Sequence, residues 1–234
     1  GDDDFPLHEA AHIVHGNALR MDWNEVVPAN QCSFILGNPP FYGARMQSKQ
    51  QKAEIQDVFH GSKNSGNIDY VAGWYIKAAE YMDPIRAAFV STNSICQGEQ
   101  VANVWKPIYD LGVRIDFAHD TFRWRNEATE QAHVYVVIVG FSKLSGKKTL
   151  FHHANPDAPE EVSNPANINA LQLRLMYSCG TEVSHCVTYH RSALAINRLT
   201  AATICSKMMR RKHSWLSNLK LLRIFTSGSA LMSS

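Results

Sequence analysis

Residues 34–41, FILGNPPF, combine residue types that could hold an amino group. The apolar start of this segment is typical of a buried strand, and the strand must end at Pro39 and Pro40 because proline has no N–H for a neighbouring strand. The Asn38 side-chain oxygen and the Pro39 carbonyl can both accept hydrogen bonds from an NH₂ group. Phe41 can stack on the base that carries this group. Because open α/β sheets bind ligands at the carboxyl ends of their strands, this segment is a candidate functional site.

The elements that must position this segment alternate along the first 145 residues. Apolar runs predict strands at residues 12–14, 34–36, 87–90, 113–117 and 132–141. Polar or periodic stretches predict helices at residues 48–59, 69–82 and 97–105. Such alternation predicts an α/β fold with a mostly parallel sheet and helices on both faces. A possible hairpin through residues 121–129 adds an antiparallel edge.

Composition excludes several classes of protein. Hydrophobic residues make up 45% of the 234 residues, which is enough for a core. No apolar run reaches 18 residues and no signal peptide is visible, so the sequence predicts neither a membrane span nor secretion. The five cysteines are scattered without a CxxC pair, which fits a reducing cytoplasm.

The NPPF motif in this setting resembles the catalytic motif of the adenine-N6 DNA methyltransferases. The order and spacing of residues 11–142 are similar to the gamma-type enzymes of restriction–modification systems. The resemblance implies a partial Rossmann-like class I methyltransferase fold that uses S-adenosyl-L-methionine, with Asn38, Pro39, Pro40 and Phe41 as catalytic residues. It also implies double-stranded DNA as a partner. The adenine amine is a poor nucleophile, and two acceptors would favour its tetrahedral form and free the lone pair for attack on the methyl group.

The same resemblance assigns further site residues. Asn17 and Asp22 follow the first predicted strand, where the family contacts the cofactor adenine, and Trp74 would flank that adenine. Phe122 or Trp124 would supply a second aromatic face for the flipped base. The alternative for Asn17 and Asp22 is a capped turn, and the alternative for Trp74 is a core aromatic residue.

Two parts that the family carries are missing. The glycine-containing loop after the first strand of the fold, and the acidic residue after the second, are not found, and neither is a domain that reads DNA sequence. The chain is therefore expected to work with the remainder of a larger polypeptide or with a separate specificity module, and to be inactive alone. The expected division is a partial catalytic domain at 1–150, a linker at 151–170 and a tail at 171–234.

The tail differs from the rest in charge. Residues 171–234 contain nine Lys or Arg and one acid, Glu182, whereas the first 170 residues contain 14 basic and 20 acidic side chains. One interpretation is a basic DNA-binding arm. The favoured one is a reading-frame slip near Ala170, because codons compatible with residues 195–207, read two bases later, can spell a sequence that resembles the family. A slipped tail is expected to be poorly ordered.

Two other function classes stay open. His8, Glu9 and His12 match HExxH, which on a helix places two histidines and a general base for a zinc metallohydrolase. Against this, Pro6 lies close to the start of such a helix and residues 13–14 are typical of a strand. The third class is a catalytically inactive DNA-binding module.

Overall fold

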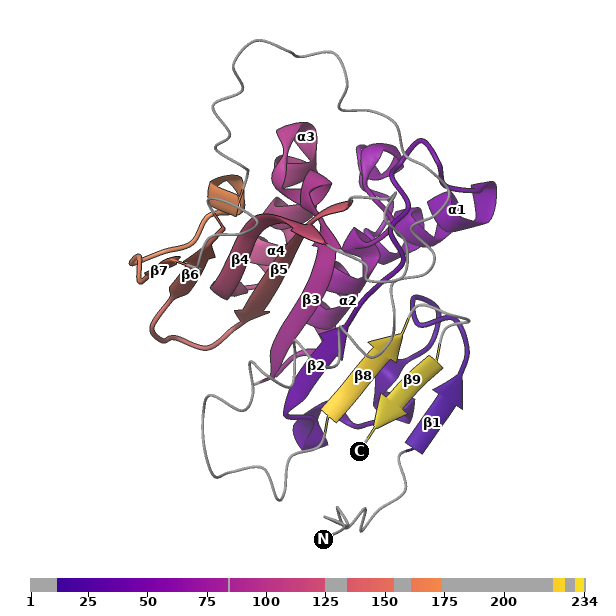
Figure 1. Cartoon of the computed structure of the whole chain (residues 1–234). Coiled ribbons are helices and arrows are strands. Elements are labelled where there is room, and N and C mark those ends of the chain that lie inside the picture. The colour runs from indigo at the N-terminus through magenta and orange to yellow at the C-terminus, as the bar shows by residue number, and fades with distance from the viewer. Residues whose placement is uncertain are drawn as a thin grey trace, which may run out of the picture.

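The computed structural model describes residues 12–83, 85–124, 134–153, 161–173, 221–225 and 230–233. These residues form one nine-stranded sheet in the order β1-β9-β8-β2-β3-β5-β4-β6-β7 (Figure 1). Its strands are β1 (His12–His15), β2 (Phe34–Gly37), β3 (Arg86–Thr92), β4 (Arg114–Trp124), β5 (Val134–Ser142), β6 (Thr149–His152), β7 (Glu161–Ser163), β8 (Leu221–Phe225) and β9 (Ala230–Ser233).

The helices are α1 (Lys49–Val58), α2 (Ala72–Tyr81), α3 (Gly98–Gln100) and α4 (Lys106–Asp110). A π-helical segment, Val101–Trp105, joins the last two. Pro107 follows this segment closely. Because the ring of a proline clashes with the carbonyl four residues earlier, Pro107 disturbs the regular helix at Asn103, inside the π-helical segment. Short 3₁₀ turns are found at Trp23–Glu25, Ala29–Gln31, Ser65–Asn67, Asn93–Cys96 and Ala170–Leu173. No helix in the described part of the chain is long and apolar enough to cross a membrane.

Strand direction agrees with the expected α/β class. β2 pairs in parallel with β3 and β8, and β4 pairs in parallel with β6. β5, β7 and β9 are antiparallel to their neighbours, so β1, β2, β3, β4, β6 and β8 all run one way. An antiparallel strand was expected at an edge of the sheet, whereas the antiparallel β5 lies inside the sheet, between β3 and β4. The predicted hairpin joins β4 and β5, and its turn lies outside the described residues.

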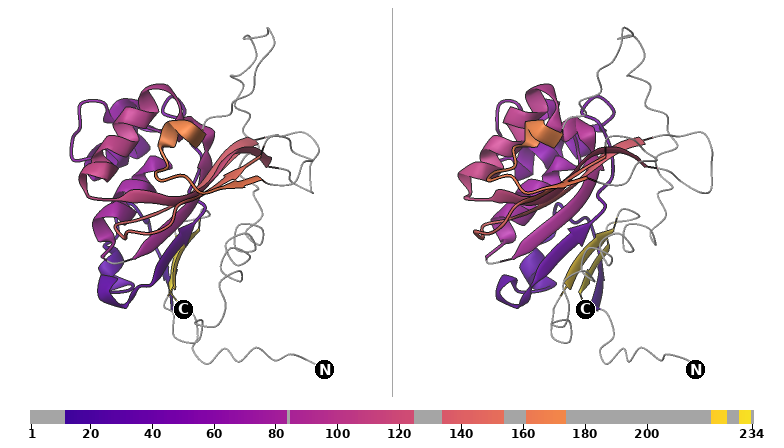
Figure 2. Two further views of the ribbon diagram at one scale, coloured as in Figure 1. Left: turned by 90° about the vertical axis from the view of Figure 1, so that its left-hand side faces the viewer. Right: turned by 60° about the vertical axis from the view of Figure 1, so that its left-hand side comes forward.

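The helices differ from expectation in their placement. Figure 2 shows α1 to α4 on one face of the sheet, whereas helices on both faces were expected. The reason is topological: the crossovers from β2 to β3 and from β3 to β4 move in the same direction along the sheet. Because such crossovers have one hand, the helices that they contain fall on the same face.

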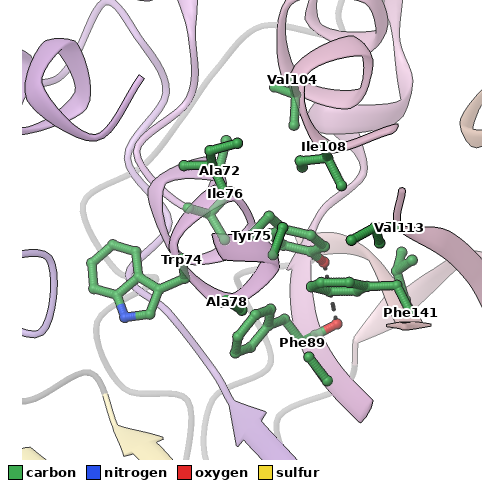
Figure 3. Close-up of a cluster of buried hydrophobic side chains, with 14 of the residues drawn as sticks. Ala72, Trp74, Tyr75, Ile76, Ala78, Phe89, Val104, Ile108, Val113 and Phe141 are labelled. Carbon is green, nitrogen blue, oxygen red and sulfur yellow. Dashed lines mark hydrogen bonds between the residues drawn. The ribbon is translucent and has the colours of Figure 1, made fainter. Parts of the chain in front are cut away.

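Helix α2 is the centre of the core. Seven of its ten residues are buried, as expected for a helix that is apolar on most sides. Tyr75 stacks on Phe141 with ring centroids 5.2 Å apart, meets Phe89 edge-on, and donates its hydroxyl to the Phe89 carbonyl at 3.4 Å (Figure 3). The same hydroxyl also shares a hydrogen bond with the Ser91 hydroxyl. Gly73 lets α2 approach its neighbours, because an added Cβ would lie 3.0 Å from the Leu19 side chain.

The strands β8 and β9 come from the predicted tail. They lie between β1 and β2, so β2 is paired on both sides, by β3 and by β8. Two short segments of the tail are thus paired in the sheet, and the expectation of a poorly ordered tail stays a prediction. Residues 174–220 lie outside the described part, and the division of the chain into domains stays a prediction.

Candidate active site

One edge of the sheet gathers the predicted site residues. β1, β2 and β4 run in the same direction, so their carboxyl ends lie at one edge. Asn17 follows β1, residues 38–41 (the NPPF loop) follow β2, and Phe122 and Trp124 belong to the end of β4. The sheet therefore places at one edge the segments that the sequence assigned to cofactor, catalysis and base, with β2 between β1 and β4 in the strand order.

Asn38 is the polar centre of the NPPF loop. The residue is buried, with 8% of its surface exposed, and its Oδ1 has no hydrogen-bond partner among the described residues. Native proteins rarely leave a buried acceptor unpaired, because each such group has lost its water without compensation. Pro39 beside it is also buried, and Pro40 is half-buried. The loop thus holds an acceptor that the described residues leave unpaired and that can accept a hydrogen bond from a further donor.

Phe41 and Phe122 lie on the same apolar patch. Both pack against a small cluster made of Val90, Val136 and Ile138. Neighbouring β5 residues belong to the main core on the helix side, so this cluster lies on the opposite face, because strand side chains alternate. Phe122 therefore lies on this face of the sheet, and Phe41 contacts the same cluster from the NPPF loop while it also packs against the main core. The side chain of Trp124 lies outside what the structure describes.

Phe122 belongs to a group of neighbouring rings that come from β4, from β6 and from His153 just after β6. Its ring centroid is 4.8 Å from that of His153 and 6.3 Å from that of His119. His119 stacks on Phe151 at 4.4 Å. Burial, with a smaller contribution from His153, lowers the pKa of His119 to about 3. The surroundings of Phe122 are therefore aromatic and include a neutral His119 at ordinary pH.

Tyr70 connects Tyr42, the residue after the NPPF loop, with the start of α2. Its backbone N–H donates to the Tyr42 carbonyl at 2.9 Å, and its ring meets that of Tyr42 edge-on at 6.2 Å. The same ring lies 5.2 Å from Trp74, again edge-on. Trp74 is buried, with 5% exposed, and its Nε1–H has no acceptor among the described residues. The indole is a core aromatic, as in one interpretation, and it also presents an unused donor.

Glu54 on α1 completes this connection. Its buried carboxylate accepts from Asn17 Nδ2 at 2.9 Å, from Arg20 at 2.8 Å and from the Tyr70 hydroxyl. Burial and this carboxylate together raise the pKa of Tyr70, so the phenol stays a donor. The predicted cofactor residues Asn17 and Trp74 are thus joined through Glu54 and Tyr70.

Asn17 and Asp22 also have local roles. Asn17 Oδ1 accepts from the Leu19 N–H at 3.0 Å, and Asp22 Oδ1 accepts from the Asn24 N–H at 2.9 Å as the N-cap of a 3₁₀ turn. The capped turn is therefore present at both positions. It leaves the amide and carboxylate with hydrogen-bonding capacity, because each group can form more bonds than these.

We expect Glu54→Ala to lower the free energy of unfolding by about 2–3 kcal/mol, the range for a buried charged acceptor whose donors are left unpaired. Urea unfolding of the chain measures this. Glu25→Ala, at an exposed position, is the matched control and should leave the unfolding free energy nearly unchanged. Equal midpoints for both variants would show that Glu54 does not hold these segments together.

The HExxH segment is only partly described. His12 opens strand β1, in agreement with the strand prediction, and His8 and Glu9 lie outside the described residues. Among residues that the structure describes, no group of three or more His, Cys, Asp or Glu is placed to hold a metal ion.

Sequence reasoning did not assign Glu54, Tyr70, Asp69 and Ser94 to the site. The signals were weak ones: a glutamate on the inner side of a polar helix, and an Asp-Tyr pair just before an apolar helix. These residues act on the candidate site through contacts made 16 to 37 positions apart in the chain.

The open α/β sheet, with the NPPF loop at its carboxyl edge, is the architecture of a methyltransferase-like domain. Residues 2–152 match the family described as MmeI, DNA-methyltransferase domain, and this chain belongs to that family. The matched range includes the NPPF loop, Asn17, Trp74 and Phe122.

Two relatives are much longer than this chain. DNA methyltransferase A of Bacillus subtilis (strain 168) is 42% identical over 153 residues, which are 63% of this chain and 17% of that protein. The Type IIL restriction-modification enzyme MmeI, solved in complex with DNA, is 46% identical with a TM-score of 0.66. That match covers 68% of this chain and 22% of MmeI.

Proposed function

We propose that this chain takes part in methyl transfer from S-adenosyl-L-methionine to the N6 amine of adenine in double-stranded DNA, within a restriction–modification system. The buried Asn38 Oδ1, which has no hydrogen-bond partner within the described part of the chain, is the observation that carries the proposal. A flipped adenine would bring an NH₂ group to this oxygen. The family, and the DNA complex of MmeI, support DNA as the substrate.

The chain's own residues would hold and activate the amine. Asn38 Oδ1 and the Pro39 carbonyl accept its two hydrogens, which localises the nitrogen lone pair. Phe41 stacks on the flipped base, and Phe122 lies on the same apolar cluster for its other side. Rate acceleration then comes from positioning and from preorganised dipoles, without a covalent intermediate.

The residues around Asn17 fit an adenosine-containing cofactor. The Trp74 indole offers a buried N–H without an acceptor among the described residues, and adenine carries ring nitrogens that accept. Asn17 keeps a second amide hydrogen, and Asp22 keeps a carboxylate oxygen for hydroxyl groups. Asn17, Asp22 and Trp74 would therefore hold S-adenosyl-L-methionine, which supplies an activated methyl group. Sequence-specific DNA reading is assigned to other parts of a longer protein or to a separate module.

The proposal is tested in a longer protein that carries this domain. The protein is incubated with duplex DNA and S-adenosyl-L-methionine bearing a deuterated methyl group, and the digested nucleosides are analysed by mass spectrometry. We expect the label in N6-methyldeoxyadenosine. Label in methylated cytosine would contradict the adenine assignment. DNA binding without any labelled nucleoside would favour the inactive DNA-binding module.

A further inference from the structure

The carboxylate of Asp69 ties the segment that directly follows the NPPF loop to two other segments. Asp69 stands just before α2 and is buried, with 6% exposed. Its Oδ1 accepts from the Ala44 N–H at 2.9 Å, three residues after Phe41, and its Oδ2 accepts from the Ser94 hydroxyl just after β3. Three chain segments therefore meet at one side chain.

Neighbouring bonds keep this junction in place. Gln100 accepts from the Asp69 N–H at 3.2 Å and donates to the Asn67 carbonyl. Gln47 donates to the Ile68 carbonyl at 2.8 Å. Residues 67–70 are thus held by Gln100 at the end of α3 and by Gln47 before α1, so the Asp69 carboxylate is held in place beside Ala44.

We propose that Asp69 is a positioning residue for methyl transfer: through the Ala44 N–H it fixes the segment that follows the NPPF loop, and so sets where the Asn38 and Pro39 acceptors lie. This inference rests on the proposed function. Asp69 touches neither base nor cofactor in this account. Its effect comes from geometry, since a displacement of about 1 Å in a catalytic group can cost roughly a hundredfold in rate.

Burial raises the pKa of Asp69, and the bonds from Ser94 and Ala44 oppose that rise. A raised folded-state pKa means that the carboxyl contributes stability below its unfolded pKa, and that this contribution is lost as the pH rises through the folded pKa. A neutral isostere is therefore not expected to destabilise the fold at pH 7. Asp69→Asn keeps an oxygen for Ala44, whereas Asp69→Ala removes it.

The first test measures the loop without substrate. Deuterium uptake at residues 42–47 of the chain reports whether the Ala44 N–H is protected. We expect faster uptake there in Asp69→Ala, slow uptake in Asp69→Asn, and unchanged uptake in Asp110→Ala, whose exposed carboxylate pairs with Lys106. If Asp69→Ala loses protection throughout the domain, Ala44→Pro serves as a second variant. It removes the donor of the same hydrogen bond and leaves Asp69 in place. Unchanged protection of the loop in either variant would overturn the proposal.

The second test measures single-turnover methylation in a longer protein that carries this domain. We expect Asp69→Ala to slow the methylation step about 10- to 100-fold, with the affinity for S-adenosyl-L-methionine unchanged and with Asp69→Asn within a few-fold of the parent. Parent-like turnover in Asp69→Ala, or an equal loss in Asp69→Asn, would overturn the positioning role. A parent protein that does not methylate adenine would refute the proposed function instead, and deuterium uptake would still decide the role of Asp69 in the loop.

Discussion

Asn38→Ala is expected to slow methyl transfer at least about a hundredfold, the usual loss when one preorganised dipole is removed from a reacting centre, while S-adenosyl-L-methionine binding stays the same. The loss falls on the chemical step because the Asn38 oxygen is proposed to bind the amine that reacts. Single-turnover kinetics in a longer protein that carries this domain separate this step from binding. Asn103→Ala, at a half-buried asparagine away from the NPPF loop, is the matched control.

The same substitution should not lower stability. Asn38 Oδ1 is buried without a partner among the described residues, so its removal eliminates a desolvated acceptor and breaks no bond that the structure shows for that atom. We therefore expect an unfolding free energy equal to or above that of the parent. Lost activity in a protein of unchanged or higher stability is typical of a functional group and not of a structural one. Full turnover in Asn38→Ala would refute the assignment.

Phe41→Ala is expected to weaken capture of the flipped base by about 1–3 kcal/mol, the usual contribution of one base–aromatic stack. A duplex with 2-aminopurine at the target position reports flipping through its fluorescence. The parent should give a strong rise in fluorescence, and Phe41→Ala should need more protein to reach it.

Phe117→Ala separates stacking from packing. Phe117 packs against the same Val90, Val136 and Ile138 cluster as Phe41 but stands on β4, outside the NPPF loop. Its loss should reduce stability with little effect on the fluorescence titration. If the two variants behave alike, Phe41 contributes to the apolar cluster and not to the base pocket.

Much of the fold follows from local patterns. The first strand, β2, β3, α1 and α2 were predicted within a few residues, because apolar runs and helical periodicity are local properties. The sequence also marks the start of α1, where Ser48 and Gln51 form a capping box. The predicted helix at 97–105 did not separate the π-helical segment from α3, and α4 at Lys106–Asp110 was not predicted, since the path there depends on Pro107 and on packing. β4 continues to Trp124 because it pairs with β5 along its length.

The candidate site was predictable to a lesser degree. The NPPF loop could be assigned from its chemistry, because prolines, amide and ring are adjacent in the sequence. The carboxylates of Glu54 and Asp69 could not, since their roles depend on Asn17, Tyr70 and Ala44, which only the fold brings near. The pairing of β2 with β8 joins residues that are even farther apart in the sequence, and no local pattern in the tail indicated it.

The central claim is that the Asn38 oxygen accepts a hydrogen bond from the target amine. A double-mutant cycle tests it: parent and Asn38→Ala, each in a longer protein carrying this domain, are titrated with duplexes that contain adenine or purine at the target position. Purine lacks the amine, so the loss in affinity on going from adenine to purine should be larger in the parent than in Asn38→Ala. The predicted coupling is about 1 kcal/mol, the worth of one such bond. An equal loss in both proteins would mean that Asn38 does not bind the amine, and would contradict the account.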